Sequence, residues 1–471
     1  MIPNGLFDGL PRRKLFSWIA ALGLVFLSSG CGIFVPNEIH YAWDTQASRP
    51  CVDCAPDRSG DEMVGLALSG GGSRAAVFAA AAAEALNQKG ILSDVTHLSS
   101  VSGGSFAAAY IGLRAPQDCQ TPAAKSTSQC VDANFDAFHE AMRSNYFREM
   151  ELNQIRSPWR ITSPSYRVSS LAAALDDAFL EGSTFSDLNN RPILFLNASD
   201  YDDGNRFLFS QQPFAAVPND EPRYLPAALR ANTFSQPGAV RATPGDFPVA
   251  LAVATSAAFP GLLGPVTIQM PAMPGQEAPR CKMQRRSLPA ACEYWHLGDG
   301  GILENTGVES LQEVILRRAD SPAPLRRSLI LSFDAGKALD TAALRRDENP
   351  DFWTEEFARV VDIANVRAEA YRDVVWESIE QDLRIPYKLI SFRLVDAELS
   401  GADWPASCTS EARYSRDINE HLRKIPTDLQ ITICDADVTE RAAHRLVEHK
   451  LTPDVIAELA RQGFLDLPPT H

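Results

Sequence analysis

The fold follows from residues 64–90, which read VGLALSGGGSRAAVFAAAAAEALNQKG. Val64–Leu68 is a short apolar segment that predicts a buried strand. A glycine-rich turn follows it, and Ala75–Gln88 is rich in alanine, the residue with the highest helix propensity. Gly90 is placed to end that helix in a left-handed conformation. The order of strand, tight turn and helix predicts the start of a parallel α/β sheet.

The same alternation continues along the chain. A second strand and helix are predicted over 95–101 and 103–113, and a buried helix rich in alanine over 247–259. Further strands are predicted at 191–198, 207–209, 265–269, 295–297 and 328–333, with 207–209 returning antiparallel. The pattern predicts a three-layer α/β/α fold with a mainly parallel central sheet.

The composition is that of a globular protein, with 45% hydrophobic and 22% charged residues among 471. Its formal net charge is −15, and no basic patch offsets that charge. We therefore exclude nucleic acid as a partner and disfavour binding to anionic lipid by charge alone.

The N-terminus has the pattern of a secretory signal. Arg12, Arg13 and Lys14 precede an apolar run over 15–27, and small residues lead to Cys31. The segment resembles a bacterial lipoprotein signal, which implies lipid attachment at Cys31. The alternatives are an uncleaved membrane anchor and a plain secreted signal.

Cysteine content agrees with export. If Cys31 carries lipid, eight of nine cysteines remain, an even number that the sequence can pair in many ways. Proximity suggests disulfides Cys119–Cys130, Cys281–Cys292, Cys408–Cys434 and Cys51–Cys54. Zinc binding at the C-x-x-C of 51–54 is a weaker option, and free buried thiols are the alternative for the whole set.

Ser102 is the candidate nucleophile. It lies in Ser-Val-Ser-Gly-Gly, residues 100–104, between a predicted strand and a predicted helix. Small neighbours fit the tight turn of a nucleophile elbow, and the helix that begins at Gly103 directs free N–H groups toward the serine. A plain Ser-Gly-Gly loop is the alternative.

Gly70, Gly71 and Gly72 form a candidate oxyanion loop, because glycines leave main-chain N–H groups unobstructed at a helix start. The loop lacks the patterns of nucleotide-binding loops. Arg74 lies in the first helical turn, where a cation opposes the helix dipole, so it requires a carboxylate partner or a substrate head group.

Asp299 is the candidate base. It lies in Gly-Asp-Gly-Gly, residues 298–301, at a predicted strand end, where the alternative is an ordinary turn. A carboxylate held close to a serine can take its proton. A Ser–His–Asp triad would need one of the histidines, but His97 and His296 lie on strands without a hydrolase-like context.

These three motifs, in this order, resemble the G-G-G-x-R, G-x-S-x-G and D-G-G motifs of patatin-like phospholipases. Residues 197–210 and 254–260 resemble two further segments of that family. The sequence departs from the family pattern at Ser100, in place of glycine, and at Thr306-Gly307, in place of Asn-Pro. The resemblance covers roughly 61–335 and implies a Ser102–Asp299 dyad, with N–H groups of the glycine loop holding the oxyanion.

The resemblance implies a lipid-ester hydrolase that needs no cofactor or metal and reaches its substrate from a membrane surface. The N-terminal signal and the cysteines predict that this enzyme lies in the cell envelope, lipid-anchored to the outer membrane or in the periplasm. An acyltransferase with the same dyad and a catalytically silent lipid-binding lipoprotein are the alternatives. We divide the chain into a signal (1–30), a tether (31–60), a patatin-like catalytic domain (61–335) and a mainly helical extension packed on it (336–471). The sequence does not define the oligomeric state.

Overall fold

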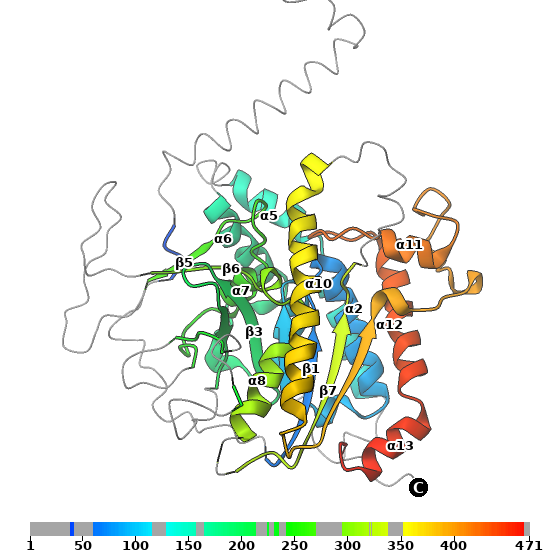
Figure 1. Cartoon of the computed structure of the whole chain (residues 1–471). Coiled ribbons are helices and arrows are strands. Elements are labelled where there is room, and N and C mark those ends of the chain that lie inside the picture. Colours follow the sequence, from blue (N-terminus) through cyan, green and yellow to red (C-terminus); the bar gives the residue numbers. More distant parts are fainter. Residues whose placement is uncertain are drawn as a thin grey trace, which may run out of the picture.

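The computed structural model describes residues 38–41, 60–114, 129–156, 164–212, 224–225, 230–234, 242–269, 294–319, 321, 323–337 and 352–465. In this part of the chain an eight-stranded sheet lies between helices on both of its faces (Figure 1). The structure confirms the predicted three-layer α/β fold with a mostly parallel sheet.

The sheet contains strands in the order β5-β6-β3-β2-β1-β7-β8, with β4 paired to β3. β1, β2, β3, β7 and β8 pair in parallel, whereas β4, β5 and β6 pair antiparallel to their neighbours. The strands are β1 (Glu62–Leu68), β2 (His97–Val101), β3 (Ile193–Asp200), β4 (Arg206–Phe209), β5 (Val266–Gln269), β6 (Tyr294–Asp299), β7 (Arg327–Asp334) and β8 (Tyr387–Arg393).

The longer helices cover both faces of this sheet. They are α2 (Gly72–Gln88), α3 (Gly103–Arg114), α4 (Gln129–Met142), α5 (Tyr146–Ile155), α6 (Pro164–Leu175), α7 (Val249–Ser256), α8 (Val308–Ala319), α10 (Phe352–Glu380), α11 (Ile418–Lys424), α12 (Ile433–Lys450) and α13 (Pro453–Arg461). Among them α10 is the long helix that stands in front of the sheet in Figure 1. Short turns of helix, among them η8 (Gly300–Ile302), complete the fold.

β1 shows how one strand serves two cores. Its residues Val64, Leu66 and Leu68 belong to the core that contains α2 and α3, and Met63 and Ala67 to the core that contains α8. Successive side chains of a strand point to opposite faces of the sheet. A nearly continuous apolar run therefore contributes side chains to the core on each face.

The chain after 335 continues the same sheet and the same core. β8 pairs in parallel with β7, and α12 packs against α2. Cys408 and Cys434 form a disulfide, the pairing that proximity in the sequence suggested. The predicted domain boundaries at residues 30, 60 and 335 remain predictions.

The elements differ from the sequence-based prediction in two respects. α2 begins at Gly72 rather than Ala75, because the carbonyl of Asp428 accepts the N–H of Ser73 and stabilises an earlier helix start. Helices α4, α5, α6, α8, α11 and α12 were not predicted from the sequence. In α4 and α12 the apolar stripes are interrupted by His139 and Glu440, which pair with each other.

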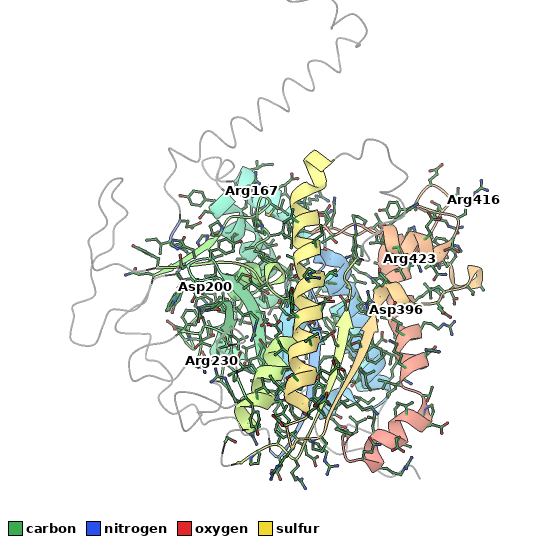
Figure 2. The ribbon with its side chains drawn as sticks, viewed as in Figure 1. Arg167, Asp200, Arg230, Asp396, Arg416 and Arg423 are labelled. Atoms are coloured by element: carbon green, nitrogen blue, oxygen red, sulfur yellow. A yellow bond between two sulfur atoms is a disulfide. The ribbon has the colours of Figure 1, made fainter. Side chains whose placement is uncertain are left out.

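Charged side chains are exposed on the C-terminal part, for example at Asp396, Arg416 and Arg423 (Figure 2). No helix within the described residues is both long and apolar enough to cross a bilayer. The predicted signal with Cys31 and the predicted pairs Cys51–Cys54 and Cys281–Cys292 lie outside the described residues, as does Cys119. The side chain of Cys130 is likewise outside them.

Candidate active site

Ser102 occupies a strained turn between β2 and α3. Its φ is 50°, in the left-handed region that side chains other than glycine seldom adopt. Small neighbours permit the turn: a Cβ on Gly103 would lie 2.0 Å from the carbonyl oxygen of Gly72, and one on Gly104 would lie 2.5 Å from that of Ser69. Ser102 itself is partly exposed, as an attacking group must be.

Asp299 ends β6 beside this turn. The Oγ of Ser102 donates a hydrogen bond of 2.9 Å to Oδ2 of Asp299, and the N–H of Gly301 donates one of 2.7 Å to Oδ1. The carboxyl group is buried, with 3% of the residue exposed. Burial raises its pKa to about 7, because desolvation of the charge outweighs the hydrogen bonds from Gly301 and Ser102.

β3 brings the two residues together. Val101, the last residue of β2, pairs with Asn197, and Asp299 pairs with Ala198, the next residue of β3. The opposite edge of β3 is occupied by β4 along this stretch. β2 and β6 therefore follow one another along a single edge of β3, and Ser102 and Asp299 lie where they meet.

The glycine loop lies against the serine. A Cβ on Gly70 would be 3.1 Å from the Cβ of Ser102, and the φ angles of Gly71 and Gly72 are 144° and 60°. Within the described residues we find no acceptor for the N–H of Gly71 or of Gly72. The structure thus brings Gly70, Gly71, Gly72 and Gly103 to one place around Ser102.

Arg74 is buried below the glycine loop, with 3% of the residue exposed. Among the partners of its guanidinium are two main-chain carbonyls. Nε and Nη2 donate to the oxygen of Ala335 at 3.1 and 2.8 Å, and Nη1 donates to that of Ile425 at 2.6 Å. The side chain therefore ties the start of α2 to two segments that come much later in the chain.

Ser256, at the end of α7, fixes the main chain of the elbow. Its Oγ accepts the N–H of Ser102 at 3.0 Å and donates to the carbonyl of Asn197 at 2.6 Å. Ser105 Oγ lies 2.8 Å from Ser256 and 3.0 Å from Ser100 Oγ. Since the Ser256 proton goes to Asn197, Ser105 donates to Ser256 and Ser100 donates to Ser105. The serine in place of the usual glycine at 100 thus takes part in this chain of hydroxyls.

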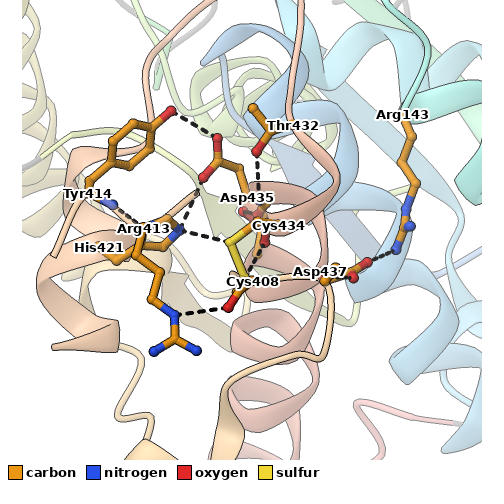
Figure 3. Close-up of a disulfide and its surroundings, with 11 residues drawn as sticks. Arg143, Cys408, Arg413, Tyr414, His421, Thr432, Cys434, Asp435 and Asp437 are labelled. Carbon is orange, nitrogen blue, oxygen red and sulfur yellow. Dashed lines mark hydrogen bonds and ion pairs between the residues drawn. A yellow bond between two sulfur atoms is a disulfide. The ribbon is translucent and has the colours of Figure 1, made fainter. Parts of the chain in front are cut away.

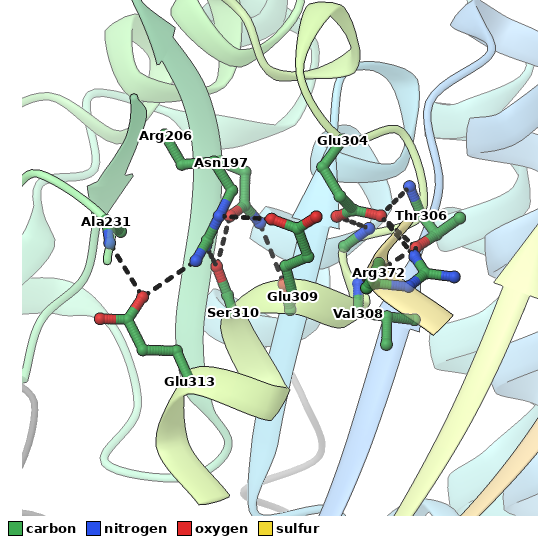
Figure 4. Close-up of polar contacts among 12 residues, drawn as sticks. Asn197, Arg206, Ala231, Glu304, Thr306, Val308, Glu309, Ser310, Glu313 and Arg372 are labelled. Atoms are coloured by element: carbon green, nitrogen blue, oxygen red, sulfur yellow. Dashed lines mark hydrogen bonds and ion pairs between the residues drawn. The ribbon is translucent and has the colours of Figure 1, made fainter. Parts of the chain in front are cut away.

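Asn197 links the elbow to a second polar network (Figure 4). Its Nδ2 donates to the carbonyl of Ser100 at 2.9 Å, and its Oδ1 accepts the hydroxyl of Ser310 at 2.6 Å. Ser310 also accepts a hydrogen bond from Arg206, which pairs with Glu313 at 2.9 Å. Asn197 and Ser256 are therefore positioning residues. Both lie in segments that resemble the patatin-like family, but the sequence alone assigns neither of them a role.

Glu304 holds Thr306-Gly307, the two residues that replace the usual Asn-Pro of the family pattern. Its carboxylate accepts the N–H of Thr306 at 2.7 Å and that of Gly307 at 2.6 Å. Arg372 of α10 donates to Oγ1 of Thr306 at 2.9 Å (Figure 4). Asn365 of the same helix donates to the carbonyl of Gly301 at 2.7 Å. α10 therefore braces the turn that follows Asp299.

Three histidines considered for a triad have other partners. His97 Nδ1 lies 2.9 Å from Oγ1 of Thr96, and His296 Nδ1 lies 2.9 Å from Oδ1 of Asp202. His139 bonds to Glu84 at 3.0 Å and to Glu440 at 3.1 Å. The carboxylate is thus the basic group in contact with Oγ of Ser102.

One cluster of possible metal ligands occurs within the described residues, formed by His421, Cys434 and Asp435 (Figure 3). It does not fit a metal. The sulfur of Cys434 is bonded to Cys408, and Nδ1 of His421 accepts the N–H of Tyr414 at 3.1 Å. The proton of the neutral ring is therefore on Nε2, the nitrogen that would have to bind the ion.

A strained serine between a strand and a helix, beside a buried carboxylate at the edge of such a sheet, is typical of serine hydrolases of α/β architecture. The sequence model of patatin-like phospholipases matches residues 66–311, just over half of the chain. The chain belongs to the patatin-like phospholipase family and is a lipid-ester hydrolase by that membership.

Several solved structures are similar to this chain, whereas no curated protein matches it. Human GIVD cytosolic phospholipase A2 has a TM-score of 0.44 and 14% identity, covering 98% of this chain and 68% of that one. VipD from Legionella pneumophila has a TM-score of 0.24 and 13% identity, covering 64% and 56%. ExoU from Pseudomonas aeruginosa, solved with SpcU, has a TM-score of 0.23 and 15% identity, covering 74% and 61%.

Proposed function

We propose that this protein hydrolyses acyl esters of glycerophospholipids or lysophospholipids with Ser102 as nucleophile and Asp299 as general base. The observation that carries the proposal is the 2.9 Å hydrogen bond from Oγ of Ser102 to Oδ2 of the buried Asp299. Membership of the patatin-like phospholipase family supports a lipid ester as the substrate.

In the first half of the reaction Asp299 takes the proton of Ser102 as Oγ attacks the ester carbonyl carbon. The carbonyl oxygen gains negative charge and lies against the N–H groups of Gly71, Gly72 and Gly103. One such donor lowers the barrier by about 3–4 kcal/mol in comparable hydrolases. When the C–O bond breaks, the proton passes from Asp299 to the leaving alcohol, and the acyl group remains on Ser102.

In the second half Asp299 takes a proton from water, whose oxygen attacks the carbonyl carbon of the acyl-enzyme. The bond from that carbon to Oγ of Ser102 then breaks, the proton passes from Asp299 back to Oγ, and the fatty acid leaves. The pKa of about 7 suits both halves, because a base of this strength accepts a proton and gives it back near neutral pH. The second oxygen of Asp299 is fixed by Gly301, so the oxygen that serves Ser102 keeps its direction throughout.

The test is an assay of the wild type, Ser102→Ala and Asp299→Asn on phospholipid, lysophospholipid and short esters. We expect both variants to lose at least about a thousandfold in kcat/KM. The matched controls are Ser93→Ala and Asp396→Asn, which change an exposed hydroxyl and an exposed carboxylate away from the site and leave activity unchanged.

The same assay separates the other functions. An acyl product that forms only with an added alcohol would identify an acyltransferase. Near-wild-type activity of Asp299→Asn would exclude Asp299 as the general base. Lipid binding without turnover by the wild type would identify a silent lipid-binding protein.

We also propose that the protein is exported to the cell envelope and anchored through lipid on Cys31. The basic, apolar and small-residue segments of the N-terminus support this. Mass spectrometry of the N-terminal peptide tests it. A diacylglyceryl mass on Cys31 that is lost in Cys31→Ser is the expected result, and an unmodified or uncleaved N-terminus contradicts it.

A further inference from the structure

A short segment of the C-terminal part, residues 425–428, lies directly on the glycine loop. The carbonyl oxygen of Asp428 accepts the N–H of Ser73 at 2.7 Å. A Cβ on Gly72 would be only 2.2 Å from the same oxygen. No residue other than glycine fits at position 72 while Asp428 remains where it is, so the two chain segments are built to touch.

Arg74 joins the same segment from below. One arm of its guanidinium donates to the carbonyl of Ile425 and the other to that of Ala335, beyond the end of β7. A planar guanidinium holds two acceptors in fixed directions, which a lysine ammonium does not. Arg74 thus holds the start of α2 against residues 425–428 and against the end of β7.

The contacts decide which N–H groups stay available at the start of α2. The first turn of a helix has N–H groups without partners inside the helix. Asp428 takes that of Ser73, and no acceptor is found within the described residues for those of Gly71 and Gly72. Neither of these two N–H groups is taken by the C-terminal segment, so both stay available for an oxyanion.

Residues 425–428 are themselves held on both sides. The disulfide between Cys408 and Cys434 closes the stretch that contains them. The carbonyl of Leu429 accepts the N–H of Phe147 at 3.0 Å, and α12, just beyond, packs on α2. The position of the two carbonyls is therefore set by the C-terminal part of the fold.

We propose that Arg74 and the carbonyls of Ile425 and Asp428 form a positioning clamp for the oxyanion loop, so that the C-terminal part of the chain completes the active site. This rests on the proposed function. The clamp acts through Gly71 and Gly72 and does not touch the substrate. Residues 425–428 lie beyond the region that matches the family model, which ends at 311.

The clamp is tested with Arg74→Lys and Arg74→Ala, and with Arg143→Ala as the control. Arg143 also ties the C-terminal part to the rest, through Asp437 (Figure 3) and Glu440 on α12. Within the described residues its ion pairs are with α12 and not with the glycine loop. We expect kcat to fall 10- to 100-fold in both Arg74 variants with KM changed less than threefold. The rate at which a fluorophosphonate labels Ser102 falls in parallel, because its P=O group needs the same donors.

Guanidinium ion in the millimolar range should restore part of the activity of Arg74→Ala and none of that of Ser102→Ala. Arg143→Ala should lower Tm while kcat and the labelling rate stay at the wild-type level. Where Arg74→Ala does not fold, Arg74→Lys decides alone, since it keeps the charge and loses the bidentate geometry. Wild-type kcat in a folded Arg74→Lys variant would overturn the clamp, as would equal losses in Arg143→Ala.

The two proposals fail in distinguishable ways. If Ser102→Ala keeps its activity, the proposed function is wrong whatever the Arg74 variants do. If Ser102→Ala is inactive and both Arg74 variants behave as the wild type, the function stands and the clamp is wrong.

Discussion

Ser102 and Asp299 are 197 positions apart in the sequence, and their side chains meet at 2.9 Å on one edge of β3. β2 leaves that edge at Asn197 and β6 joins it at Ala198, so the geometry of the pair follows from strand register rather than from a loop. Sites built on strands hold their side chains more rigidly than sites on loops. The contact therefore exists before any substrate binds.

The first prediction concerns the pH dependence of activity. Asp299 must be ionised to accept the proton of Ser102, and burial raises its pKa to about 7. We expect kcat/KM to fall about tenfold per pH unit below 7 and to level off above it. A pH–rate profile between 5 and 9 measures this, and a limb centred near pH 4 would contradict the assigned base.

The second prediction concerns stability. A carboxyl group with a folded pKa near 7 and an unfolded value near 4 favours the folded state below pH 4, and this contribution is lost as pH rises through 7. Asp299→Asn carries no charge. Its amide oxygen can accept the N–H of Gly301, and its amide nitrogen can donate to Oγ of Ser102, which reverses the direction of that bond. We expect it to be more stable than the wild type at pH 8, by up to roughly 4 kcal/mol, and equal to it near pH 4.

Denaturant unfolding at pH 4 and pH 8 measures the difference. Asp396→Asn is the control, because that carboxylate is exposed on the C-terminal part. A stability gain of Asp299→Asn that is the same at both pH values would point to packing rather than to the charge.

The sequence predicts the main features of this fold because its strands and glycine turns are local patterns. The run 64–90 is sufficient to predict β1, the turn and α2, and the motifs around Ser102 and Asp299 predict the two residues that the structure joins. Helices such as α4 and α12 were missed because His139 and Glu440 interrupt their apolar stripes. Those two polar residues are paired across helices, and pairing of this kind has no signature in a single sequence.

The supporting residues of the site are beyond sequence reasoning for a similar reason. Ser256 and Asn197 act through one main-chain N–H and two carbonyls, and such contacts depend on the packing of α7 against β3. Arg74 was recognised as a cation in an unfavourable place, and its partners on 335 and 425 became visible only in the folded chain.

The third prediction concerns the strain at the elbow. Ser102 has a φ of 50°, which costs about 1 kcal/mol or more for any residue other than glycine. Ser102→Gly should therefore raise the free energy of unfolding by about 1 kcal/mol or less, since glycine also makes the unfolded chain more flexible, and should abolish turnover. Ser102→Ala keeps the Cβ and the strain, and it is the matched control. A Ser102→Gly variant that is less stable than Ser102→Ala by the usual cost of glycine, about 0.5–1 kcal/mol, would show that the turn is not strained.

The fourth prediction concerns the disulfide between Cys408 and Cys434. A loop with a sequence separation of 26 residues gains about 3–4 kcal/mol from closure in the chain-entropy model. We expect the double variant Cys408→Ala, Cys434→Ala to unfold at lower denaturant concentration by this amount. A reducing agent should shift the wild type by this amount more than it shifts the variant, because the other predicted disulfides are reduced in both proteins. Equal shifts in the two proteins would show that the bond between Cys408 and Cys434 is not formed.

The fifth prediction concerns the polar junction of three helices, where His139 of α4 lies between Glu84 of α2 and Glu440 of α12. Burial opposes the charge on His139, but the hydrogen bonds that its ring donates to Glu440 and Glu84 outweigh burial and raise its pKa to about 9. Hydrogen bonds from His139 and His444 lower the pKa of Glu84 to about 2. The stabilisation from the histidine is complete below pH 6.5 and is lost as pH rises through 9, whereas that from Glu84 is complete above pH 4.5 and is lost toward pH 2.

His139→Gln can still donate a hydrogen bond but does not titrate, so it lacks the stabilisation that the charged histidine gives. The Tm of the wild type should therefore exceed that of His139→Gln by several degrees at pH 6, and the difference should shrink toward pH 9. Thermal unfolding followed by circular dichroism at pH 6, 7.5 and 9 measures both curves, and the titration of Asp299 affects both alike. Parallel curves for the wild type and the variant would show that the junction does not titrate in this range.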